Sequence, residues 1–154
     1  MFLNLRLEST TPLLRQRFDA DPERRFAVVL ENDAAVMKWF KPGKAVFKIH
    51  YGHEATEYES DFVVETETAK FLCEPKRENQ MRDPEVLAKA EAAATWCHHA
   101  SEHAKLYGGK PWSYLLIPHH VIADNQTLQG LAATYTIVQH PAKASGTGQT
   151  STAP

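Results

Sequence analysis

Asp61, Glu74 and Lys76 are the residues of this chain whose types and spacing could support chemistry. They belong to the segment EYESDFVVETETAKFLCEPK (57–76), in which two short apolar runs flank a turn. Side chains of a strand alternate between its two faces, so Glu74 and Lys76 point in the same direction if the second run is a strand. A carboxylate and an ammonium group then lie side by side at the end of that strand.

A hairpin that turns around Glu67 and Thr68 places Asp61 directly opposite Glu74. Opposed residues of antiparallel strands share a face, with Cα atoms roughly 4.5–5.5 Å apart. Two carboxylates at that distance repel each other, and one of them takes up a proton unless a cation lies between them. The pattern therefore predicts an oxygen-rich site for Mg²⁺, with Asp61 and Glu74 as ligands and Lys76 beside it.

The charge distribution concentrates acid around this pair. Residues 50–74 contain one Lys and seven Asp/Glu, whereas the whole chain of 154 residues has a net charge of −2. A bound divalent cation would offset part of the local negative charge. The near-neutral total predicts weak DNA binding by the chain alone, because affinity for DNA depends largely on neutralising phosphates.

The composition is typical of a single soluble domain, with 43% hydrophobic and 23% charged residues. No apolar run approaches the ~20 residues needed to span a bilayer, and the N-terminal apolar stretch is too short for a secretory signal. Two cysteines, Cys73 and Cys97, do not make a disulfide framework. These features predict a cytoplasmic protein with no membrane partner. Cys73 points away from Glu74 and is expected in the core.

Helix-start patterns occur twice, as Asp-Pro-Glu at 21–23 and again at 83–85. The first helix should run to about Glu31, and the second should carry a stripe of mostly small residues and end at Gly108 and Gly109. Residues 35–40 fit either a strand or a last helical turn. A strand is expected over 46–51, two more within 57–76, another over 112–117, and a short helix over 127–133.

This order predicts an α/β fold. A helix is followed by three antiparallel strands, a long helix, another strand and a last helix, which favours a central mixed β-sheet flanked by helices. We expect an N-terminal extension over residues 1–18, one domain over 19–136, and a disordered tail over 137–154, where large apolar residues are nearly absent.

The words DPERRFAVVLE, WFKP, YESDFVVET, FLCEPKR and PWSYLLIPHH, in this order, resemble the C-terminal nuclease domain of the restriction subunit of type III restriction enzymes. That domain belongs to the PD-(D/E)XK nuclease superfamily, and the resemblance covers about residues 19–134. The bare D…ExK pattern is weak, but the ordered set is more specific. The resemblance implies a PD-(D/E)XK restriction-endonuclease-like core and a Mg²⁺-dependent DNA endonuclease, for which Mn²⁺ can substitute.

Site roles follow from the same resemblance. Asp61 and Glu74 would bind the metal, Lys76 would position or activate the attacking water, and the Pro75 carbonyl would be a further ligand. Glu23 matches the acid of the first helix, which supports the metal or its water; acids are also favoured in a first helical turn by the helix dipole alone. Proline lacks an N–H, so the strand should end, bulge or lie at an edge there.

The chain departs from the family pattern in two ways. Ser60 stands where the family's proline precedes the aspartate, and no Walker-type Gly-Lys loop of a helicase motor is present. The expected partners are double-stranded DNA, a helicase/ATPase polypeptide and a modification methyltransferase subunit. The alternative is a catalytically inactive remnant or assembly module that docks on such a helicase or methyltransferase.

A third hypothesis concerns Cys97, His98, His99 and His103 on the second long helix. Two histidines four residues apart on a helix can share a Zn²⁺ ion. The same spacing also fits an exposed helix face with Cys97 on the buried stripe. No second ligand group with a familiar zinc spacing occurs elsewhere in the sequence.

Overall fold

The computed structural model describes residues 21–44, 46–51 and 56–139, so the expected extension over 1–18 and most of the expected tail lie outside the described residues. The described elements are α1 (Asp21–Asn32), β1 (Val36–Phe40), β2 (Ile49–Tyr51), β3 (Thr56–Tyr58), β4 (Phe62–Thr66), β5 (Lys70–Lys76), α2 (Pro84–Lys105), β6 (Trp112–Pro118), α3 (Leu128–Tyr135) and β7 (Thr136–Ile137). Two short 3-10 helices, η1 (Glu78–Gln80) and η2 (His119–Val121), follow β5 and β6. None of the described helices has the length and apolar character required to cross a bilayer.

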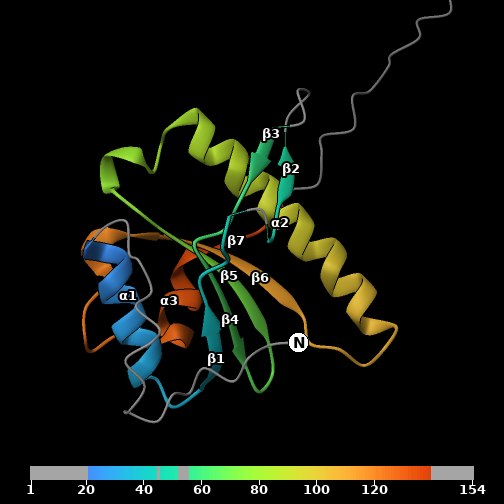
Figure 1. Cartoon of the computed structure of the whole chain (residues 1–154), viewed down its shortest axis with the longest axis horizontal. Coiled ribbons are helices and arrows are strands. Elements are labelled where there is room, and N and C mark those ends of the chain that lie inside the picture. Colours follow the sequence, from blue (N-terminus) through green and yellow to red (C-terminus); the bar gives the residue numbers. More distant parts are fainter. Residues whose placement is uncertain (1–20, 45, 52–55, 140–154) are drawn as a thin grey trace, which may run out of the picture.

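A five-stranded mixed sheet with the order β1-β4-β5-β6-β7 forms the centre of the fold. Its β1–β4, β4–β5 and β6–β7 pairs are antiparallel, and β5–β6 is parallel. The 22-residue helix α2 makes the crossover between the two parallel strands, as a parallel pair requires. The predicted α/β class with a mixed sheet flanked by helices is confirmed, and Figure 1 shows α1 and α3 on one side of the sheet and α2 on the other.

One strand assignment was wrong. Residues 46–51 were expected to form a strand of the central sheet, but only Ile49–Tyr51 is extended, and it pairs with β3 in a separate two-stranded ribbon. The place beside β4 is taken by β1, which settles the choice that the sequence left open at 35–40. The expected alternation of faces is correct here, since Ile49 is buried and His50 is exposed.

The helix boundaries follow their capping residues. The Asp83 side chain accepts a hydrogen bond from the Glu85 backbone N–H and Pro84 is the first residue of α2, while Thr127 caps α3 in the same way. After α2, Gly108 adopts a positive φ of 67° and the N–H of Gly109 donates to the Ala104 carbonyl at 2.8 Å. A left-handed residue at this place is a common helix ending.

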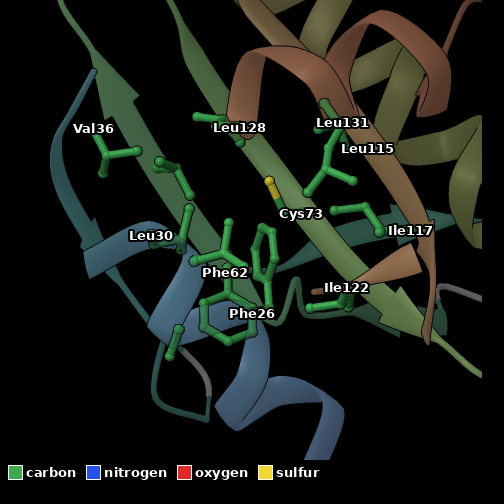
Figure 2. Close-up of a cluster of buried hydrophobic side chains, with 13 residues drawn as sticks. Phe26, Leu30, Val36, Phe62, Cys73, Leu115, Ile117, Ile122, Leu128 and Leu131 are labelled. Carbon is green, nitrogen blue, oxygen red and sulfur yellow. The ribbon is translucent and has the colours of Figure 1, made fainter. Parts of the chain in front are cut away.

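Two apolar cores lie on the two faces of the sheet. The first contains side chains of α1, β4, β5, β6 and α3, with Cys73 fully buried among them as expected (Figure 2). The rings of Phe26 and Phe62 meet edge to face with centroids 5.0 Å apart. Because Glu23 lies one turn before Phe26, the packing that buries Phe26 also turns Glu23 toward the sheet.

The second core lies under α2 and the β2–β3 ribbon. Ala90, Ala93 and Cys97 form the buried stripe of α2, and their small side chains allow the helix to approach the sheet closely. Tyr58 of the ribbon and Tyr114 of β6 are buried in the same core. The ribbon is thereby packed over the end of β5, where the candidate site residues lie.

Candidate active site

The candidate residues meet at one edge of the central sheet because of strand direction. β5 and β6 are parallel, and β1 runs the same way because both β1 and β5 are antiparallel to β4. The ends of β1, β5 and β6 and the beginning of β4 therefore share one edge. Lys41 follows β1, Asp61 precedes β4, and Glu74 and Lys76 end β5.

The hairpin register is the one expected from the sequence. Phe62 pairs with Cys73, Glu65 pairs with Lys70, and the chain turns over residues 66–69. One step beyond the first pair, Asp61 faces Glu74, and the Asp61 backbone N–H donates to Glu74 Oε2 at 3.3 Å. The register prediction is confirmed, and the two carboxyl groups share one patch.

Glu74 is a buried carboxylate, with 4% of its surface exposed. Its Oε1 atom lies 2.7 Å from Nζ of Lys76, and its Oε2 atom accepts a hydrogen bond of 2.8 Å from the Tyr58 hydroxyl. A buried charge is tolerated where an opposite charge and hydrogen bonds surround it. Strands β5 and β3 supply these two partners, and the Asp61 backbone N–H, just before β4, is a third donor.

Asp61 has a different environment. Burial, and then the neighbouring carboxylates of Glu74 and Glu23, raise its pKa from the ordinary 3.8 to about 8, against the opposing charges of Lys76 and Lys41. Without a further cation, Asp61 is therefore mostly protonated at neutral pH. A divalent ion between Asp61 and Glu74 would favour the charged form.

Glu23 lies in the first turn of α1 with 8% of its surface exposed. Its Oε2 atom forms a salt bridge with Nζ of Lys41, which also lies over the Phe62 ring, 5.6 Å from the centroid. The structure thus brings Glu23 near enough to raise the pKa of Asp61, as expected of an acid beside the site. The Lys41 ammonium group therefore offsets the charge of the Glu23 carboxylate, a pairing that the sequence did not predict.

Pro75 is buried and continues β5 beside Ile117 of β6, whereas pairing of β5 with β4 ends at Cys73. On the β4 side Pro75 therefore lies beyond the ladder, which meets the requirement for a residue without an N–H. Its carbonyl is contacted by His119, the first residue of η2. The proposed carbonyl ligand accordingly has a histidine neighbour, which directly follows β6.

Metal-binding groups can be assessed over residues 21–44, 46–51 and 56–139. In these ranges no three His, Cys, Asp or Glu side chains gather into a group that could hold a metal. This includes Cys97, which is buried, and the three histidines of α2, all of which are exposed. The candidate ligands remain those that the resemblance implies, the Asp61–Glu74 pair together with the Pro75 carbonyl.

Three residues near the site are not among the predicted site residues: Tyr58, Lys41 and His119. Lys41 and His119 each follow a strand whose end lies at this edge, so the strand directions would have indicated them once β1 was assigned to the sheet. Tyr58 reaches Glu74 from a ribbon outside the sheet, and no local pattern indicates that contact.

No protein-family model matches this chain, and no curated protein matches it.

Proposed function

We propose that this chain is a Mg²⁺-dependent DNA endonuclease domain with a PD-(D/E)XK core, similar to the nuclease domain of type III restriction enzymes. The observation that supports this most directly is the convergence of Asp61, Glu74 and Lys76 at one sheet edge, with Lys76 Nζ 2.7 Å from Glu74 Oε1. The pattern of elements expected from the resemblance agrees with the mixed sheet and its crossover helix.

The donor set fits Mg²⁺ better than a softer metal. Mg²⁺ binds oxygen ligands and usually takes one or two protein carboxylates, keeping several waters. Asp61 and Glu74 supply the carboxylates and Pro75 a carbonyl, while the raised pKa of Asp61 marks a place where a cation relieves carboxylate repulsion. When bound, the ion would supply charge stabilisation at the scissile phosphate.

Lys76 has the protonation state needed to orient a nucleophile and to stabilise negative charge. Burial lowers its pKa, but the carboxylates of Glu74 and Asp61 outweigh burial, so the pKa of Lys76 is raised above its ordinary 10.5. Lys76 is an ammonium ion at neutral pH and can donate to water or to a phosphate oxygen. It therefore acts as a positioning cation and not as a general base.

The substrate implied by this chemistry is double-stranded DNA. Because the acidic site and the net charge of −2 disfavour tight binding to phosphates, we expect productive binding to require a DNA-holding partner such as a helicase/ATPase polypeptide. A modification methyltransferase subunit would supply sequence recognition.

Nicking of supercoiled plasmid by the purified chain tests the proposal. Reactions contain Mg²⁺, Mn²⁺ or EDTA, with Glu74→Ala and Lys76→Ala as inactive candidates and Glu65→Ala, from the far end of the same hairpin, as the matched control. We expect metal-dependent nicking that both site variants lose and the control retains. Activity unchanged in Glu74→Ala would refute the assignment, and no nicking with or without a helicase partner would favour an inactive assembly module.

A further inference from the structure

Tyr58 is the residue through which the β2–β3 ribbon reaches the candidate site. It is the last residue of β3 and has only 4% of its surface exposed. Its hydroxyl donates to Glu74 Oε2 at 2.8 Å, although β3 does not pair with any strand of the central sheet. The contact is therefore made by tertiary packing of the ribbon and not by sheet geometry.

The two carboxylate oxygens of Glu74 have different partners. Oε2 accepts from the Tyr58 hydroxyl and from the Asp61 backbone N–H, at 2.8 and 3.3 Å. A carboxylate has about two lone-pair positions on each oxygen, so these two donors satisfy Oε2. Oε1 lies 2.7 Å from the ammonium group of Lys76 and is the oxygen that can bind a cation.

The environment of Tyr58 makes it a fixed donor. Its side chain is buried, and its hydroxyl hydrogen is directed at Glu74 Oε2. Its ring packs edge to face against Tyr114 with centroids 6.4 Å apart, and the two hydroxyl oxygens are separated by 3.4 Å. Phe47, which precedes β2, packs the ribbon against α2: its ring meets that of Trp96 edge to face, with centroids 4.9 Å apart.

We propose that Tyr58 is a positioning residue that fixes the Glu74 carboxylate so that Oε1 is presented to a divalent cation. This inference rests on the proposed function, since it assigns to the ribbon the orientation of one ligand of that metal site. Partners that orient metal ligands commonly contribute 10–100-fold to metal affinity.

The test is a titration of the full chain with Mn²⁺. The electron paramagnetic resonance signal of free Mn²⁺ reports how much of the ion remains unbound. Tyr58→Phe deletes one oxygen and keeps the ring, and Tyr135→Phe, on α3 at the opposite core, is the matched control. We expect Tyr58→Phe to weaken Mn²⁺ binding about 10-fold and the control to stay within about twofold. Nicking by Tyr58→Phe should need more Mn²⁺ but approach the wild-type rate at saturation, a split that a purely structural role would not produce.

The outcomes separate the two proposals. Wild-type affinity in a folded Tyr58→Phe protein would overturn the positioning role and leave the metal site intact, whereas a wild-type chain that binds no Mn²⁺ would overturn both. Should Tyr58→Phe fail to fold, ring-labelled tyrosine in the wild-type chain gives a second measurement by NMR. Saturating Mg²⁺ should shift the Tyr58 resonance and leave Tyr135 unchanged; an unchanged Tyr58 signal would contradict the inference.

Discussion

Two acidic side chains, one at each end of β4, have pKa values that are shifted in opposite directions. Asp61 immediately precedes β4 and Glu65 lies near its other end, and the spacing of four residues places both on one face of the sheet. The pKa of Asp61 is raised to about 8, mainly by burial and then by Glu74. The pKa of Glu65 is lowered, mainly by a hydrogen bond from Lys110.

The difference shows what separates a structural ion pair from a site built for a ligand. Lys110 donates at 2.7 Å both to Glu65 Oε1 and to the Thr66 carbonyl, so charge and hydrogen bonds at the turn end are satisfied within the chain. At the other end, Asp61 is surrounded by two further acids, and the lysines do not compensate for its burial. Such strongly perturbed groups are typical of functional sites.

The largest expected effect is on activity. Asp61→Asn removes the charge needed to bind a cation, and we expect nicking to fall at least ~100-fold, or about 3 kcal/mol of transition-state stabilisation. Glu65→Gln is the equivalent change at the other end of β4 and should stay within about twofold in the same plasmid assay. Equal losses of nicking activity in the two variants would contradict the assignment of the site to the Asp61 end of β4.

The second expected effect is on the pH dependence of stability in EDTA. The folded-state pKa of Asp61 lies above its ordinary value of 3.8, so its contribution to stability is fully present below about pH 4 and is lost as the pH rises toward 8. The free energy of unfolding should fall by at most about 1.4 kcal/mol per pH unit in this window.

Urea unfolding between pH 5.5 and 8 measures this slope. Asp61→Asn should flatten it, and saturating Mg²⁺ should reduce it in the wild-type chain. A wild-type slope identical to that of Asp61→Asn would mean that Asp61 titrates normally and that the site lacks carboxylate repulsion.

The smallest expected effect is at the turn end. Lys110→Met should cost no more than about 1 kcal/mol of unfolding free energy at pH 7, because partly exposed ion pairs contribute little. The contribution of Glu65 to the free energy of unfolding should be present above its ordinary pKa of 4.5. It should be lost as the pH falls through the folded-state pKa, which is lowered. If urea unfolding shows that Lys110→Met loses more than about 2 kcal/mol of unfolding free energy, the Lys110–Glu65 ion pair contributes more to stability than a partly exposed pair should.

The parts of the molecule that could be predicted from sequence depend on local rules. The hairpin register follows from two apolar runs and a two-residue turn, so the opposition of Asp61 and Glu74 was predictable. Both long helices begin with Asp-Pro-Glu, and α2 has a cap and a small-residue stripe that place it on the sheet.

The parts that were missed depend on long-range packing. Alternating residues over 46–51 indicate an extended segment but not its partner, and the ribbon with β3 depends on burial of Phe47 and Tyr58 against α2 and β6. The contact of His119 with Pro75 depends on the parallel register of Lys76 with Pro118, which no local pattern encodes.

Calorimetric titration of Mg²⁺ into the purified chain at pH 7, with Asp61→Asn and Glu65→Gln beside the wild type, measures whether Asp61 and Glu74 form a metal site. We expect a saturable Mg²⁺ site in the wild type, retained in Glu65→Gln, lost in Asp61→Asn, and accompanied by proton release as Asp61 ionises. Absence of a site in the wild type, or binding unaffected by Asp61→Asn, would contradict this assignment.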